Sequence, residues 1–535
     1  MRRSALHAPL ALVLLVAATS LVGVAASKGL PTGATGAPQQ VVRGGVHHHS
    51  AVAAHGYPGS AAGTVQSADV SPTAYGEPKV ITSHNGVLRV WFKPHDGKAK
   101  INGKVWGGTR TFTGTFPGPT LHVNPGDTID MKFTNLLSQV TNLHFHGFRV
   151  SPSGLADNVL RTIAPAVTTK KVGSKKTVRI VVHIPADHEQ GLYWYHPHFH
   201  GLVDAQVYPG LAGMIVVGDV LRQFPWLDHI KRRTMALQSV QFGDDGNLVN
   251  VNKVSSKQLT NLVNGHYQPT LRIRPGEVQL WQVANISNEH WYKLFLGGQK
   301  LHVIGEDGNP VGRTWSSTRL LLAPAKRFSF LVVGPKAGSY TLKSLAFNQG
   351  FNKFGEYTLA QVVSAGKPVK PLRIPTVISP SQAKLIRDVR NDAVSRRRVL
   401  TFSIESPFPK NSQAFKINGK LYNPRVVNER VHLGQTEEWL LRNTSSEDHP
   451  FHIHTNDFLV EQVNGRKVAI HGFQDTVKIP FEPKNGKPGT VLIRQRYRKF
   501  QGEAVFHCHI LFHEDNAMMG NILFGPRVFN PSFGK

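Results

Sequence analysis

Short segments with alternating apolar and polar residues recur along the chain, and three of them resemble one another. The copies run from Phe116 to Asn135, from Tyr267 to Asn285 and, more diverged, from Tyr422 to Asn443. Each has a proline, an alternating apolar strand, a glycine turn followed by a polar residue, and a second strand ending in Asn. Alternation of period two around a glycine turn is typical of β-hairpins. Copies at intervals of roughly 150 residues therefore predict three related β-domains, at 75–220, 221–375 and 376–535.

The first 74 residues lack this alternation. Met1-Arg2-Arg3 and the apolar run from Ala8 to Ala26 predict an export signal over 1–27, with an uncleaved membrane anchor as the alternative. Residues 28–74 are rich in Gly, Ala, Ser, Pro and His, which predicts a disordered linker. We expect an exported protein, secreted or held in the periplasm or cell envelope. The Arg2-Arg3 pair leaves the general secretory and twin-arginine routes open.

Composition narrows the class of protein. With 40% hydrophobic and 18% charged residues, the 535-residue chain fits a globular protein, and its 50 Gly and 34 Pro favour β-structure with many turns. The formal net charge is +29. For an exported chain this charge favours anionic cell-surface polymers, acidic lipids or negatively charged substrates over nucleic acid, or simply a solvated basic surface. We expect a monomer.

Cysteine usage points toward chemistry. Cys508 is the only cysteine, so the chain forms no internal disulfide. A lone Cys in an exported protein is either buried filler or a thiol kept for chemistry, and its neighbours decide between them.

Ten histidines fall into four clusters, one of which contains Cys508. The clusters are His144-Phe-His146-Gly147, His196-Pro-His198, His449-Pro-Phe-His452-Ile-His454, and His507-Cys508-His509 with His513 and Met518 following. A single histidine is more often a hydrogen-bonded structural residue, but this set of spacings is rare by chance. On a strand, residues i and i+2 share a face, so each His-x-His pair points two imidazoles in one direction. Cys508 points away from its flanking histidines, which places two metal sites on opposite faces of one strand.

The ligand types separate these two sites. One thiolate, two imidazoles and a distant thioether favour copper in an electron-transfer site, a set that His449, Cys508, His513 and Met518 provide. A group made only of imidazoles suits copper, zinc or iron, with water or dioxygen completing the coordination.

With these four motifs, the chain from Glu77 to Pro531 resembles the three-domain multicopper oxidases, such as laccases, bilirubin oxidases and cuprous-ion oxidases. The resemblance implies an all-β fold of three consecutive cupredoxin-like Greek-key β-sandwich domains, with copper in the first and third. It also implies four copper ions per chain, whose ligands carry over as follows: type 1 copper, His449, Cys508, His513 and Met518; type 2 copper, His144 and His452; the type 3 pair, His146, His196, His198, His454, His507 and His509.

Two carboxylates lie where similar enzymes place residues that deliver protons to reduced oxygen. They are Asp157, eleven residues after His146, and Glu514, beside His513. Since reduction of dioxygen to two waters consumes four protons, a relay is chemically required. Either residue could instead be an ordinary surface or turn carboxylate.

The resemblance implies one-electron oxidation of a small donor coupled to reduction of dioxygen to water. Phenols and aromatic amines are the first expectation, because only six Met occur and only Met518-Met519 are adjacent, unlike the methionine-rich cuprous-ion oxidases. Oxidation of Cu(I), Mn(II) or Fe(II) is the alternative. A non-enzymatic copper-binding protein of the cell envelope is a third hypothesis, and a two-domain nitrite reductase does not account for paired His-x-His motifs in both end domains.

Overall fold

The computed structural model describes residues 71–166, 177–255, 258–408, 412–481 and 486–526. The predicted export signal, the linker up to residue 70 and the last nine residues of the chain lie outside the described residues. Residues 71–74 are described, and Ala74 forms a parallel bridge with Thr270. Within the described ranges, no helix has the length and apolar character needed to cross a membrane.

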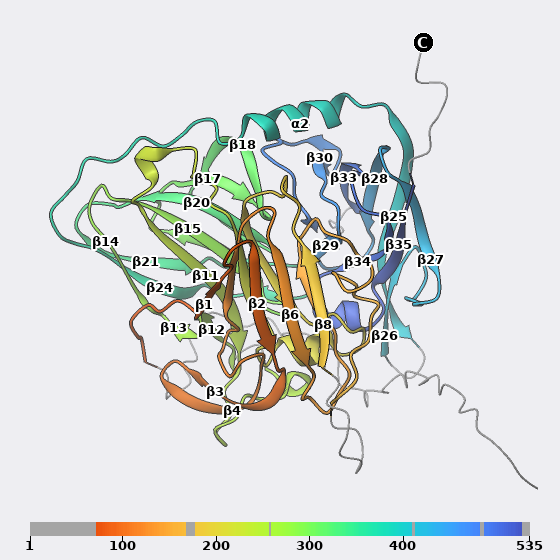
Figure 1. Ribbon diagram of the computed structural model, residues 1–535, viewed down its shortest axis with the longest axis horizontal. Helices are drawn as coiled ribbons and strands as arrows, with labels where there is room; N and C mark the ends of the chain where they lie inside the picture. Colours follow the sequence, from red (N-terminus) through yellow and green to blue (C-terminus); the bar gives the residue numbers. More distant parts are fainter. Residues whose placement is uncertain (1–70, 167–176, 256–257, 409–411, 482–485, 527–535) are drawn as a thin grey trace, which may run out of the picture. The chain divides into compact units, whose positions relative to one another are not determined.

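The first domain is built from two sheets and a two-stranded ribbon (Figure 1). The five-stranded sheet contains, in spatial order, β1 (Val80–Thr82), β5 (Thr120–Val123), β10 (Gly213–Val217), β9 (Gly191–His196) and β7 (His144–His146). The three-stranded sheet contains β2 (Val87–Phe92), β6 (Thr128–Thr134) and β8 (Thr177–His183). The ribbon pairs β3 (His95–Ile101) with β4 (Lys104–Thr111), and helix α1 (Val203–Val207) follows β9.

The second domain also has two large sheets. The seven-stranded sheet is ordered β13 (His266–Tyr267), β12 (Thr260–Val263), β11 (Lys231–Val240), β15 (Val278–Asn285), β20 (Arg327–Val333), β17 (Leu301–Glu306) and β18 (Asn309–Ser317). The five-stranded sheet is ordered β14 (Thr270–Ile273), β24 (Tyr357–Ser364), β21 (Gly338–Ser344), β16 (Tyr292–Leu296) and β19 (Leu320–Leu322). Smaller elements are η1 (Pro225–Leu227), η2 (Val251–Lys253) and the pair β22 (Phe347–Asn348) and β23 (Lys353–Phe354).

The third domain repeats the two-sheet arrangement. Its six-stranded sheet is ordered β26 (Ser412–Ile417), β25 (Val394–Phe408), β28 (Thr436–Asn443), β33 (Gly489–Arg496), β30 (Leu459–Val463) and β31 (Arg466–Lys467). Its five-stranded sheet is ordered β27 (Val427–His432), β35 (Met519–Gly525), β34 (Gly502–Cys508), β29 (His449–Ile453) and β32 (Thr476–Ile479). Helix α3 (Leu511–Asp515) follows β34. The described residues are thus mostly β, which confirms the all-β prediction.

The hairpin prediction for the three repeats is wrong in one respect, since the two strands of each copy do not pair. β5 and β6, β14 and β15, and β27 and β28 each belong to different sheets. The glycines between them, Gly126, Gly276 and Gly434, have φ values of 92°, 78° and 84°. Only glycine adopts this left-handed conformation freely. The turn therefore serves as a corner that carries the chain from one sheet of the sandwich to the other.

The Asn that ends each repeat has the same structural role in all three domains. Asn135, Asn285 and Asn443 are fully buried. In each case the side-chain oxygen accepts a hydrogen bond from the backbone N–H two residues later, and the amide group donates to carbonyl oxygens of the following loop. The loop after Asn443 leads directly into β29, and the loop after Asn135 leads toward β7. The sequence repeat thus fixes the loops that deliver two of the histidine clusters.

Each domain has its own apolar core, and a further cluster joins all three. This shared cluster contains Trp194 of the first domain, Ala284 of the second and Leu511 of the third, all fully buried. Burial of apolar surface between domains stabilises their contact by about 25 cal/mol per Å². Strands β9 and β15 also lie against each other across the boundary of the first and second domains.

Helix α2 (Pro380–Asn391) packs against β18 of the second domain and β33 of the third (Figure 1). Its N-cap is Ser379, whose hydroxyl accepts a hydrogen bond from the backbone N–H of Gln382. We expect Ser379→Ala to lower the free energy of unfolding by about 1 kcal/mol, because one partly buried helix N–H loses its side-chain acceptor. Urea unfolding followed by circular dichroism would measure this, with the exposed Arg387→Ala as control. Equal stability of both variants would contradict the capping role.

Candidate metal centre

The first two histidine clusters lie on neighbouring strands of one sheet. β7 and β9 run antiparallel, with His144 opposite His196 and His146 opposite Trp194. His198 follows just after β9, and its backbone N–H donates to the side-chain oxygen of Asn142 at 2.6 Å. All four histidines are buried. The strand pairing therefore gathers the four imidazoles of the first domain at one end of its sheet.

The other two clusters are paired in the same way in the third domain. β29 and β34 run antiparallel, with His452 opposite His507 and Phe451 opposite Cys508. His454 and His509 continue the two strands, two residues further on. The pattern of period two thus places His452 with His507 on one face and Cys508 on the other, as the sequence predicts.

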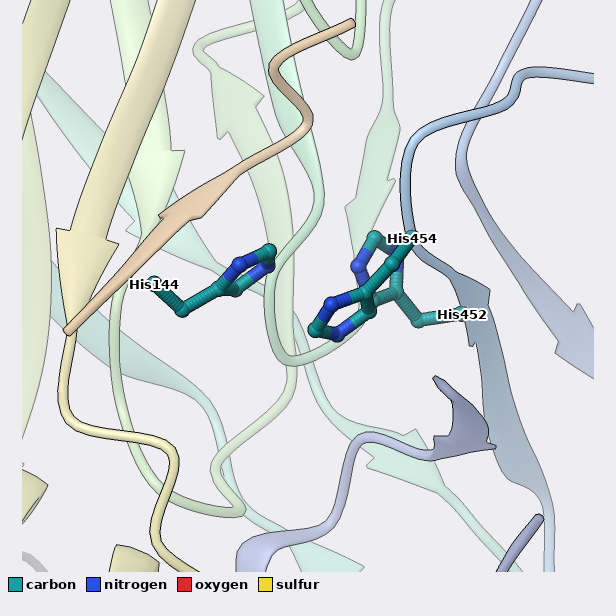
Figure 2. A group of neighbouring side chains, drawn as sticks. All are labelled: His144, His452 and His454. Carbon is teal, nitrogen blue, oxygen red and sulfur yellow. The ribbon is translucent and has the colours of Figure 1, made fainter. Parts of the chain in front are cut away.

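Eight imidazoles from the two domains meet in one place, which we call the eight-histidine cluster: His144, His146, His196, His198, His452, His454, His507 and His509. The rings of His144 and His454 stack with their centroids 3.8 Å apart, and those of His146 and His452 stack likewise at 3.8 Å. Figure 2 shows His144 facing His452 and His454 across the junction of the two domains. His144 belongs to two groups of three histidines whose ring nitrogens lie within 4.8 Å of one another. One group includes His452 and His454, and the other includes His146 and His196. The first and third domains therefore build this cluster jointly.

The chemistry of these residues fits metal ions. Ring nitrogens of His144, His146, His196, His452 and His509 are buried and have no hydrogen-bond partner. An unpartnered buried polar atom costs free energy unless a ligand satisfies it. Burial also lowers the pKa of His144, His146 and His509 well below the ordinary value, which keeps these imidazoles neutral. Neutral, convergent, unpartnered nitrogens are the form in which histidine ligates a metal.

A second group, which we call the cysteine site, lies on the other face of β34. The Sγ atom of Cys508 is 3.5 Å from Nδ1 of His449 and 3.6 Å from Nδ1 of His513. All three residues are buried. Burial raises the pKa of the Cys508 thiol, whereas a bound cation would favour the thiolate. One sulfur and two imidazole nitrogens this close to each other suit a copper site.

Two further residues complete the surroundings of the cysteine site. Met518 is fully buried in the same apolar core, its carbonyl accepts from the N–H of Cys508, and its own N–H donates to the carbonyl of His513. Nε2 of His513 lies 3.4 Å from a carboxylate oxygen of Glu447. The other oxygen of Glu447 accepts from Gln349, which belongs to the second domain. Nε2 of His513 thus lies beside a carboxylate that a residue of the middle domain holds in place.

Both predicted proton carriers lie against the eight-histidine cluster. Each carboxylate oxygen of Asp157 is 3.0 Å from Nδ1 of His144, and one accepts from the backbone N–H of Phe145. Glu514 lies 3.0 Å from Nδ1 of His507 and 3.4 Å from Nε2 of His198. Burial raises the pKa of Asp157 to about 8 and that of Glu514 to about 7. Neither residue is a surface carboxylate, since both are buried.

Three residues that contact these sites had no signal in the sequence. Asp475 lies 3.4 Å from Nε2 of His146, and its carbonyl accepts from Nδ1 of His452. Ser445 contacts Nε2 of His449 at 2.7 Å, and Glu447 contacts His513. These residues lie in loops with no motif spacing, so only the fold brings them to the ligands. His200, by contrast, packs its ring against Tyr422 and belongs to none of the ligand groups found among the described residues.

Asp157→Asn tests whether the carboxylate beside His144 matters. We expect the rate of oxygen consumption of the copper-loaded protein to fall by about 10–100-fold, because carboxylates that orient metal-bound histidines have effects of this size. By family resemblance, copper bound to a cysteine sulfur gives an intense blue colour, and this colour should not change, since the contacts of Asp157 are with His144 and Phe145. Continuous recording with an oxygen electrode would measure the rate. An unchanged rate would show that the carboxylate is dispensable.

Comparison with known proteins gives a consistent result. Three family models, each described as multicopper oxidase, match residues 94–221, 229–364 and 394–527. The multicopper oxidase mco of Staphylococcus aureus is 26% identical over 460 residues, which covers 83% of this chain and 91% of the relative. A laccase of Bacillus stratosphericus is 25% identical, over 78% of this chain and 90% of its own length. The structure of a Campylobacter jejuni multicopper oxidase, described as a metallo-oxidase, matches with a TM-score of 0.68 at 23% identity, covering 85% of this chain and 95% of that one.

Proposed function

Because the chain belongs to the three-domain multicopper oxidases, which are oxygen-reducing copper enzymes, we propose that it is laccase-like and oxidises small phenolic or aromatic amine donors. Copper bound at the two sites would supply the one-electron redox chemistry and the binding of dioxygen. For each dioxygen reduced to two waters, donors give up four electrons and four protons are consumed. The proposed ligands are those named from the sequence, with one type 1, one type 2 and two type 3 ions.

One observation carries this proposal. Cys508 faces His449 and His513, while the residues before and after it, His507 and His509, belong to the eight-histidine cluster. A few covalent bonds of one strand therefore join a site that receives electrons to a site that consumes them. A protein that only stores copper has no need of this connection, which argues against the non-enzymatic alternative.

Protons are proposed to reach the eight-histidine cluster through Asp157 and Glu514. Asp157 contacts His144 of the first domain, and Glu514 contacts both His198 and His507. The two carboxylates thus contact different histidines, so each can hold a proton beside a different part of the eight-histidine cluster. These contacts support proton delivery at two separate places in the eight-histidine cluster.

The donor is proposed to exchange electrons at the edge of His513. Phenolic donors are favoured because the chain has six Met with only Met518 and Met519 adjacent. A specific observation favours metal ions as the second candidate. The Glu447 carboxylate lies 3.4 Å from Nε2 of His513, and carboxylates bind hard cations.

Oxygen uptake measured with a phenol, an aromatic amine, Cu(I), Fe(II) and Mn(II) separates these donor classes. We expect uptake with the phenol and the amine, in a ratio of four one-electron oxidations to each dioxygen consumed. Activity with a metal ion alone would replace the laccase-like proposal by metal oxidation. Bound copper without uptake from any donor would favour the non-enzymatic alternative.

Export is part of the proposal, supported by the basic and apolar residues at the start of the chain. Cell fractionation, with N-terminal sequencing of the recovered protein, would test it. The net charge of +29 supports retention at anionic cell-surface polymers. Release of the protein by salt alone is the expected sign of such retention.

A further inference from the structure

A buried ion pair joins the second and third domains next to the eight-histidine cluster. Arg327, the first residue of β20, has no exposed surface, and Asp475 is 3% exposed. The two Nη atoms of Arg327 donate to the two carboxylate oxygens of Asp475, each at 2.7 Å. This paired geometry is the strongest that an arginine and a carboxylate form, and it fixes the angle between them.

The second domain holds the same segment by further contacts. Asp307 accepts from the backbone N–H of Arg327 at 3.1 Å and from the backbone N–H groups of Asp475 and Thr476 at 3.2 Å. Nζ of Lys326 donates to Asp307 at 2.8 Å and to the carbonyl of Thr476 at 2.9 Å. The backbone at 475–476, which leads into β32, is therefore held by side chains of the neighbouring domain.

On its other side, Asp475 touches histidines of two domains. Nδ1 of His452 donates to the carbonyl of Asp475 at 2.9 Å. With the proton on Nδ1, the lone pair of His452 is on Nε2, which is buried and unpartnered. A carboxylate oxygen of Asp475 lies 3.4 Å from Nε2 of His146 in the first domain. One residue thus orients His452 of the third domain and lies against His146 of the first.

The glycine of the His-x-His-Gly motif makes room for the ion pair of Arg327 and Asp475. Gly147 has a φ of +82°, and a Cβ added there would lie 2.3 Å from Nη2 of Arg327 and 2.6 Å from the carboxylate of Asp475. Any larger residue would displace one of the two partners. Besides two proposed ligands, the motif therefore includes a glycine whose lack of a side chain leaves room for Arg327 and Asp475 beside them.

We propose that Arg327, acting through Asp475, fixes the orientation of His452 beside His146 and thereby sets the copper affinity of the eight-histidine cluster. Both are positioning residues. The proposal rests on the ligand assignment made above and adds to it a role for the second domain, which supplies Arg327 but no histidine to the ligand groups found in the described ranges. The second domain would therefore contribute to ligand positioning although it supplies none of the proposed ligands itself.

Three variants test the proposal: Asp475→Asn, Arg327→Met and Arg327→Lys. After copper loading and dialysis against a weak chelator, we would measure copper per chain, the type 2 copper signal in electron paramagnetic resonance, and the blue absorption. Asp475→Asn and Arg327→Met should lose copper from the eight-histidine cluster about 10–100-fold more readily while keeping the blue colour. Arg327→Lys should lie between them and wild type, because lysine keeps the charge but not the planar fork.

Arg398→Met is the matched control. Arg398 is also buried, and its Nε and Nη2 donate to both oxygens of Glu437 at 2.6 and 2.9 Å within the third domain. It should keep copper at both sites. Full retention of the type 2 signal in Asp475→Asn and Arg327→Met would overturn the proposal, and so would an equal copper loss in Arg398→Met. If Arg327→Met does not fold, Arg327→Lys and Asp475→Asn decide. A wild-type protein without a type 2 signal would instead refute the ligand assignment.

Discussion

Cys508→Ser is expected to abolish the blue colour of the copper-loaded protein and to reduce donor-driven oxygen uptake to the uncatalysed background. The intense colour belongs, by family resemblance, to the bond between copper and a cysteine sulfur, and Cys508 is the only cysteine in the chain. The serine hydroxyl is nearly the same size, so the buried core around it should survive. It is a poor ligand for copper compared with a thiolate. Visible absorption and oxygen-electrode traces of the two proteins at equal concentration would measure both effects.

The same variant should keep copper at the eight-histidine cluster, because none of those ligands is altered. Met519→Leu is a suitable control, since Met519 is a neighbour of the proposed ligand Met518 but packs with Val159 and Val505 instead. Its colour and activity should match the wild type. A Cys508→Ser protein that stayed blue would refute the assignment of the cysteine site.

Removal of copper should have the largest effect on stability. In the absence of metal, the eight-histidine cluster leaves several buried ring nitrogens without partners, and it lies between the first and third domains. An ion present at about a thousand times its Kd contributes roughly 4 kcal/mol at each site it occupies. We therefore expect the copper-free protein to unfold at a markedly lower temperature, with the contact between these two domains lost first.

Differential scanning calorimetry of the copper-loaded and copper-free proteins would measure this change, and hydrogen exchange would place it. Protection should fall most at β7, β9, β29 and β34, which carry the histidines. A uniform loss of protection over all three domains, or no loss of protection, would contradict the role of the metal in joining the first and third domains. Addition of zinc to the copper-free protein serves as a control for the occupancy of the sites without redox chemistry.

The local pattern of the sequence was enough to predict which strands carry the histidine clusters and Cys508. Side chains alternate between the two faces of a strand, and this alternation depends only on neighbouring residues. It predicts that the two imidazoles of each His-x-His pair share a face and that Cys508 points away from His507 and His509. The structure places these ten histidines in two buried groups, as that pattern implies, and the three domains are of the cupredoxin type. Pairing of the repeat strands was predicted wrongly, because a glycine turn such as that at Gly126 has the same sequence whether it closes a hairpin or crosses between sheets.

The supporting contacts could not be predicted for a different reason. Arg327 and Asp475 are 148 residues apart and meet only because two domains pack together. Neither residue belongs to a motif, and single charged residues are normally exposed. Glu447 and Ser445 likewise gain their contacts with His513 and His449 from the loop that follows the buried Asn443. Long-range packing, rather than local preference, decides such positions.

The single buried thiol also gives the molecule a built-in chemical reporter. Because Cys508 is the only cysteine and has no exposed surface, an alkylating reagent can label the native chain only when the third domain opens. The labelled fraction, read as a single mass increment, would count opening events of one strand without any engineered probe. Copper bound to the sulfur should protect it from the reagent, so the labelling rate should fall as the copper concentration rises.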